Sequence, residues 1–387
     1  MRQNRIGSFD TLRGLAALAV CLLHSTPVFG LQKFVPHAYI VVDFFFCLSG
    51  YILVTRYKHL IAGDGHGPGI GFRHFSVIRL ARLYPLYAIA LILGAGYTIL
   101  RLATTGKFDG HLGLVGGAFA AAVFVLPWFD TSKILHAESA AFPYVTQSWS
   151  LFWELIASGL FYYWARSGKT RTVVMSAIAG LAAIIVLALH EKTLDGGWQI
   201  FNFWSGGARA LFSVSLGIVL ANSQIIERCK QDATAARWLN ILGYSAFALA
   251  ALYIVCGIDA NLWIEMAIVA VAFPATIVAF SNTDNRLLSN RVGNWLGEIS
   301  YSVYLLHGTF IIVILTVMGR YHFIHAGIPT GVVCVASILF VSTFVRRWIE
   351  LPAQTWLKSR LARRVSARAE SRRAAAAPIG LADVEKP

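Results

Sequence analysis

Residues 10–25 read DTLRGLAALAVCLLHS, an apolar run with an arginine near its start and a histidine near its end. An apolar segment of about 20 residues is long enough to cross a bilayer as a helix. A basic head followed by an apolar core also occurs in secretory signal peptides, but no small-residue cleavage site follows this run. The stretch therefore predicts the first helix of a membrane protein, with Arg13 and His24 inside it.

The composition places the whole chain in the same class. The sequence has 387 residues, of which 57% are hydrophobic and 13% charged, whereas soluble domains carry about 25% charged residues. The net charge of +14 comes from basic residues in short loops between apolar runs, a placement that orients membrane helices and argues against nucleic-acid binding. The five cysteines are scattered and mostly lie inside apolar runs, so neither a disulfide framework nor a metal site is expected.

Ten apolar runs are candidate membrane spans: 9–29, 39–55, 83–100, 149–165, 172–190, 205–222, 239–256, 262–280, 299–318 and 327–347. An eleventh run, 112–128, is shorter and could be a span, a re-entrant segment or an interfacial helix. With ten spans and a cytoplasmic amino terminus, most Lys and Arg fall on the cytoplasmic side, as the positive-inside rule requires. We therefore expect an all-α, polytopic helical bundle over residues 1–352, with both termini cytoplasmic and a basic, low-complexity tail over 353–387.

Arg13 and His24 are separated by ten residues, so about 100° per residue brings both side chains to one helix face within roughly 20°. Their axial separation is about 16 Å at the usual helical rise. Asp10, one turn before Arg13, lies near the same face. Ionisable groups inside a membrane are costly and usually face a bundle interior or a wet cavity. This face of the first helix is therefore a candidate functional surface.

Two carboxylates are candidate partners for His24. Asp43 lies early in the second span and Glu154 early in the fourth, both at a predicted depth near the outer third of the bilayer. A carboxylate bonded to one imidazole nitrogen makes the other nitrogen a better base. We therefore expect His24 to act with Asp43 or Glu154 in deprotonating a hydroxyl group, the alternative being a structural cluster that joins three helices.

Three arginines crowd the cytoplasmic entrance to the third span. Arg73, Arg79 and Arg82 lie in FRHFSVIRLARLYPLY, which covers residues 72–87. Guanidinium groups bind phosphate in bidentate fashion, so several together favour a polyphosphate ligand. Anchoring to anionic lipid head groups is an equally good explanation from composition alone.

Taken in order, the sequence motifs resemble those of the membrane acyltransferase-3 family over nearly the whole length to Pro352. The resemblance is carried by FDTLRGLA with Arg13 and His24, VVDFFFCLSGYIL, Arg79-x-x-Arg82 followed by Tyr84-Pro85, WSLFWE, ISYSVYLLH and WIELP. Each motif alone is weak, but six in the right order are specific. Members of this family transfer acyl groups to sugars, lipids and macrolides.

The resemblance implies transfer of an acyl group, most simply acetyl, from cytoplasmic acyl-coenzyme A to a hydroxyl group of a carbohydrate or glycolipid. It implies that Arg79 and Arg82, with Arg73, hold the donor phosphates and that Arg13 lines the donor path. His24 would be the general base, assisted by Glu154 or Asp43, and a covalent acyl-histidine is the less favoured variant. Further substrate-binding residues implied are Asp10, Trp149, Ser150, Tyr301 and His307.

No permanently bound cofactor is expected, and acyl-coenzyme A is a substrate. The expected partners are this donor, the acceptor glycan and membrane lipids, in a bacterial inner membrane. The main rival is a transporter or flippase for a glycan or glycolipid intermediate, which would also place charges inside the membrane. A membrane-embedded binding protein without turnover is a third alternative.

Overall fold

The computed structural model describes residues 7–63, 69–130, 132, 134–135, 139–223, 231–281, 289–321, 324–357 and 359–360. Within these ranges the chain folds into helices, and the only β-type pairing is an isolated bridge between Ala140 and Gln199. This confirms the predicted all-α class.

The longer helices are α1 (Gly7–Phe29), α2 (Val41–Ala62), α3 (Phe72–Thr104), α4 (Leu112–Val123), α5 (Ser148–Ser167), α6 (Thr170–Glu191), α7 (Phe203–Asn222), α9 (Ala233–Val255), α12 (Arg291–Arg320) and α13 (Ile328–Val345). One further membrane helix consists of α10 (Leu262–Ala267), a π turn (Ile268–Ala272) and α11 (Phe273–Ser281).

Among the described residues, nine helices are long and apolar enough to cross a membrane. They coincide with nine of the ten predicted spans. The remaining one, 149–165, corresponds to α5, a 20-residue helix that is not in this apolar set. Its polar and aromatic side chains fit its interior position, because α5 packs against α2, α3 and α7. The sequence thus predicted a polytopic helical membrane protein correctly.

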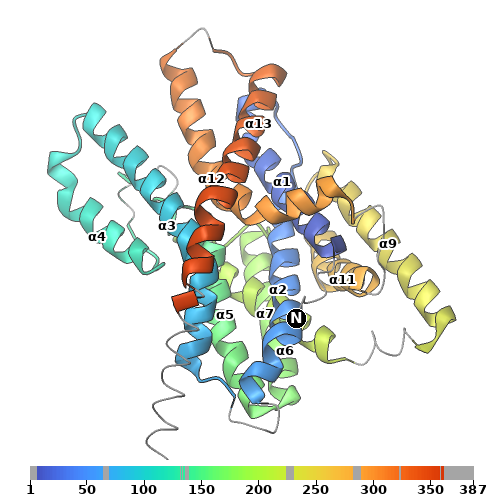
Figure 1. The fold of residues 1–387 in the computed structure, drawn as a ribbon. Coiled ribbons are helices and arrows are strands. Elements are labelled where there is room, and N and C mark those ends of the chain that lie inside the picture. Colours follow the sequence, from blue (N-terminus) through green and yellow to red (C-terminus); the bar gives the residue numbers. More distant parts are fainter. Residues whose placement is uncertain are drawn as a thin grey trace, which may run out of the picture.

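The eleventh apolar run forms α4, which ends at Val123 after 12 residues. Such a helix is about 18 Å long, shorter than the roughly 30 Å hydrocarbon core. The chain then turns back, and Tyr84 and Tyr87 of α3 donate hydrogen bonds to the last carbonyls of α4, at Val123 and Ala122. In Figure 1, α3 and α4 form a hairpin that projects from one side of the bundle. The expectation that 112–128 does not cross as a full span agrees with this length.

Close approaches of helix backbones position the centre of the molecule. A Cβ atom added at Gly297 of α12 would collide with the backbone of Asp10 in α1, and one at Gly217 of α7 would collide with the Cys47 carbonyl in α2. Membrane helices associate through such small residues because lipid offers no hydrophobic driving force between them. The pairs α1–α12 and α2–α7 are accordingly the most extensive helix contacts. They meet near the middle of Figure 1.

The last helix extends past the expected domain boundary at residue 352. A π turn (Arg346–Glu350) follows α13, and the helix continues to Leu357. Gln354 holds it in place, because its side-chain amide donates to the Arg82 carbonyl and to Glu350. The first residues of the predicted tail therefore belong to the membrane helix, whereas residues 361–387 lie outside the described residues.

Candidate active site

A cavity of about 470 Å³ opens between six of the helices. Its walls come from α1, α2, α3, α5, α12 and the helix that follows α13. The cavity brings together residues from all six of the motifs singled out in the sequence. It includes the predicted site residues Asp10, Arg13, Arg79, Arg82, Ser150, Glu154 and Tyr301.

Ion pairs hold two of the arginines in the cavity wall. The Arg79 guanidinium is buried and lies 2.7 Å from Glu154 Oε1, which also accepts a hydrogen bond of 3.0 Å from Ser49. Arg13 lies 3.8 Å from Asp10, one turn earlier in α1. Arg13 thus pairs with Asp10 and lines the cavity. Both pairs reduce the cost of holding charge within the bundle.

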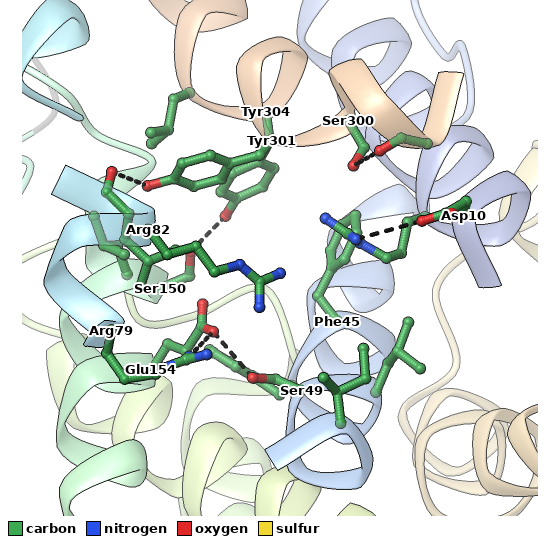
Figure 2. A pocket seen from close by; sticks show the side chains of 18 of the residues that line it. Asp10, Phe45, Ser49, Arg79, Arg82, Ser150, Glu154, Ser300, Tyr301 and Tyr304 are labelled. Atoms are coloured by element: carbon green, nitrogen blue, oxygen red, sulfur yellow. Dashed lines mark hydrogen bonds and ion pairs between the residues drawn. The ribbon is translucent and has the colours of Figure 1, made fainter. Parts of the chain in front are cut away.

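Arg82 is arranged differently from Arg79. Its side chain extends toward the middle of the cavity in Figure 2, and no ion pair to it is found among the described residues. Its backbone carbonyl accepts a hydrogen bond from Gln354. A guanidinium that lines a cavity without a carboxylate partner can bind an anionic ligand through paired N–H groups.

The rim on the α13 side contains a charged cluster to which sequence reasoning assigned no role. Glu350 is buried and accepts hydrogen bonds from Arg346 (2.6 Å), Gln354 (2.9 Å) and Ser302 (3.2 Å). Arg346, Glu350 and Gln354 all line the cavity. The motif WIELP contains Glu350 but not Arg346, whose place in the wall follows from the π turn that begins there.

The opposite end of the cavity is bounded by less polar side chains. Tyr304 and Leu305 come from α12, Ser150 from α5 and Phe45 from α2. The hydroxyl groups of Tyr304 and Ser150 are 2.8 Å apart, and a dashed line marks this contact in Figure 2. Tyr301, one turn earlier in α12, donates a hydrogen bond of 2.9 Å to the Leu83 carbonyl. Ser150 and Tyr301, both predicted from motifs, therefore do line this cavity.

Beyond this end lie His24 and His307. Their rings stack with centroids 5.1 Å apart, although 283 positions separate them in the sequence. His307 is fully buried, and its Nδ1 lies 3.0 Å from the Val303 carbonyl, which can only accept a hydrogen bond. Nδ1 therefore carries a proton, and Nε2 accepts from the Gln147 amide at 3.3 Å. His24 is exposed and is not one of the residues that line the cavity.

Glu154, one of the two carboxylates expected to pair with His24, pairs with a different residue. Glu154 bonds Arg79 in the arginine-rich part of the cavity, about 10 Å along α5 from Gln147 at the usual helical rise. The depth was misjudged because α5 begins beside His307, inside the bundle. The chain reaches that point through the segment after α4, and its path cannot be read from hydropathy.

Asp43 has a different partner again. It is almost fully buried, and its Oδ2 accepts hydrogen bonds of 3.0 and 2.7 Å from Arg209 of α7, while Ser213 bonds Oδ1 at 3.2 Å. Arg209 also donates to the carbonyls of Tyr39 and Gly196. This buried network joins α2 to α7, which is the structural alternative considered for these carboxylates.

Two further predicted residues lie away from the cavity. Trp149 is buried against α7, with the Arg209 guanidinium 5.2 Å from its ring centroid, so it packs with the Asp43 network. Arg73 is exposed in the first turn of α3 and does not line the cavity. Neither residue is placed to touch a ligand bound in the cavity. In the described ranges, no group of three or more His, Cys, Asp or Glu side chains could hold a metal ion.

Comparisons with curated proteins identify relatives. The chain is 24% identical over 371 residues to the putative peptidoglycan O-acetyltransferase YrhL of Bacillus subtilis, covering 90% of this chain and 55% of that protein. The peptidoglycan O-acetyltransferase OatA of Listeria monocytogenes is 23% identical over 365 residues, with the same coverage. The chain thus spans about half the length of these two relatives.

A shorter relative, protein 2 in the picA locus of Rhizobium radiobacter, is 32% identical over 183 residues, which cover 46% of this chain and 93% of that protein. No solved structure matches. The family described as the acyltransferase domain matches residues 6–347, nearly the whole chain, including the histidine pair and all the cavity-lining residues except Glu350 and Gln354. The chain therefore belongs to the membrane acyltransferase-3 family and is an integral membrane acyltransferase.

Proposed function

We propose that this acyltransferase moves an acyl group, most simply acetyl, from acyl-coenzyme A on the cytoplasmic side to a hydroxyl group of a carbohydrate or glycolipid. The observation that carries the proposal is one cavity with an arginine-rich opening at one end and a histidine pair beyond the other. A donor whose phosphates bind at the arginines would extend its thioester toward the histidines.

The arginines at the donor end support the binding of several phosphates. Arg82 is available to a ligand, and Arg79 can exchange Glu154 for a phosphate oxygen without moving out of the cavity wall. Guanidinium–phosphate pairs form two parallel charge-assisted hydrogen bonds, which give both affinity and orientation. The positive-inside distribution of Lys and Arg supports a cytoplasmic location for this end of the cavity, where acyl-coenzyme A would be available.

At the other end, His24 would act as the general base. Its imidazole takes the proton from the acceptor hydroxyl while the hydroxyl oxygen attacks the thioester carbonyl carbon. The carbon–sulfur bond then breaks, and the departing coenzyme A thiolate takes the proton from the imidazolium, so an O-acyl ester and a free thiol result. His307 would orient His24 by stacking, since its own nitrogens are occupied by Val303 and Gln147.

The acceptor class is supported by the relatives. Two of them are named peptidoglycan O-acetyltransferases, one putatively, and their names describe transfer to a glycan. The exposed position of His24 would let such a large acceptor approach from the side opposite to the donor. A flippase would not need the free Arg82 guanidinium at the cavity opening, and the family membership also favours acyl transfer.

Membrane vesicles of known orientation test the proposal. Inside-out vesicles that contain the protein should transfer label from added acetyl-coenzyme A to an envelope glycan enclosed in the lumen. Sealed right-side-out vesicles, with the glycan outside, should transfer label only when the donor is loaded inside. Equal transfer from donor added to either face would contradict a cytoplasmic donor site. Absence of transfer in both orientations, with a range of glycans, would refute the proposed reaction.

A further inference from the structure

We propose that Tyr304 and Phe45 form a gate between the donor cavity and His24, and that the width of this gate selects short acyl groups. The inference rests on the proposed donor and assigns its acyl-chain specificity to two side chains. It starts from the observation that Tyr304 and Phe45 line the cavity, whereas His24 and His307 do not.

The gate is located by ring contacts between three helices. Tyr304 lies one turn before His307 on α12, and the centroids of these two rings are 6.1 Å apart. On its other side, the Tyr304 ring is 5.9 Å from the ring of Phe45 in α2. Because Tyr304 lines the cavity and contacts His307, whereas neither His307 nor His24 lines it, Tyr304 lies between the cavity and the histidine pair. An acyl group that moves from the cavity to His24 has to pass it.

A hydrogen bond to Ser150 holds the Tyr304 side chain in this position. Ser150 donates to the Gln147 carbonyl at 3.1 Å, so the Tyr304 hydroxyl group is the donor in its 2.8 Å contact with Ser150. The Gln147 side chain contacts His307. The gate and the histidine pair are thus tied to the same turn at the start of α5, and a displacement of Tyr304 costs this hydrogen bond.

The side chains that line the cavity near the gate explain why the length of the acyl chain would matter. Around the gate the cavity wall is formed by large side chains, including Leu151 and Leu305, and protein interiors pack with few voids. An acetyl group carries only one methyl group on the thioester carbonyl. It therefore needs a smaller opening than any longer acyl chain. Each added methylene has to displace Tyr304 or Phe45 further from their contacts.

The inference is tested by competition between acetyl-, butyryl- and hexanoyl-coenzyme A in the same membranes. Tyr304→Ala and Phe45→Ala should raise the ratio of butyryl to acetyl transfer by about tenfold or more, the usual effect of methylene-sized changes in a pocket. Tyr304→Phe, which keeps the ring, should retain the acetyl preference. Tyr97→Ala is the matched control, because it removes a similar 2.8 Å hydroxyl contact, to Thr316, away from the cavity.

Measuring a ratio within one preparation makes the result independent of protein abundance. If Tyr304→Ala and Phe45→Ala do not accumulate, Phe45→Leu still widens the gate with a small loss of volume and should shift the ratio in the same direction. An active wild-type protein with unchanged ratios in these gate variants would overturn the gate and leave the proposed function standing. A wild-type protein that uses none of the three donors would instead refute the proposed function.

Discussion

Replacing Asp43 by Asn separates a structural role for this carboxylate from a catalytic one. The Asp43–Arg209 pair is buried, with 1% and 3% of the two side chains exposed. Asparagine keeps the shape and can still accept one hydrogen bond, but it leaves the Arg209 guanidinium without a counter-charge. Breaking a buried pair in this way costs about 3–5 kcal/mol, and for a chain of 387 residues a loss of that size corresponds to about 4–6 °C in the unfolding midpoint.

The assay is thermal unfolding of the purified protein in detergent, alongside acyl transfer per folded molecule. Asp43→Asn should unfold at the lower temperature, and its transfer rate below that temperature should stay near the wild-type rate. Asp259→Asn is the control, because its pair with Lys33 is exposed and should contribute little. A normal unfolding midpoint together with lost transfer would refute the structural role and return Asp43 to the reaction.

Two further predictions concern donor binding and helix packing. Arg82→Ala should weaken acyl-coenzyme A binding by about 1.5–3 kcal/mol, the range for charged hydrogen bonds. The control is Arg171→Ala, which replaces an exposed arginine at the start of α6 and should leave donor affinity unchanged. Unchanged apparent donor affinity in Arg82→Ala would favour lipid anchoring. Gly217→Val should strongly reduce the amount of folded protein, because its side chain would collide with the backbone of α2, whereas Gly319→Val meets nothing and should accumulate normally. Equal amounts of both variants would show that α2 and α7 do not approach as described.

The sequence was sufficient for the fold class because hydropathy and helix length depend only on local residues. Nine predicted spans are apolar helices, and the shorter run at 112–128 forms the 12-residue α4. The shared face of Asp10 and Arg13 also followed from helical periodicity, and both side chains line the cavity. The cytoplasmic location of both termini stays a prediction.

The partners of the charged residues could not be predicted in the same way. Asp43 pairs with Arg209, 166 positions later, and no local pattern indicates such a contact. His24 stacks on His307 for the same reason: α1 and α12 pack together although they lie near opposite ends of the chain. The depth of Glu154 in the membrane could not be predicted either, because α5 begins inside the bundle and carries Glu154 to the arginine-rich end of the cavity.

The most direct test of the proposed mechanism is acyl transfer by His24→Ala, measured with labelled acetyl-coenzyme A beside donor binding and protein abundance. Removal of a general base should lower the rate by about 10²–10⁴, while donor binding and abundance stay normal, since the arginines and the buried pairs are untouched. His190→Ala, at the exposed end of α6, should transfer at the wild-type rate. Normal transfer by a well-folded His24→Ala protein would contradict the mechanism.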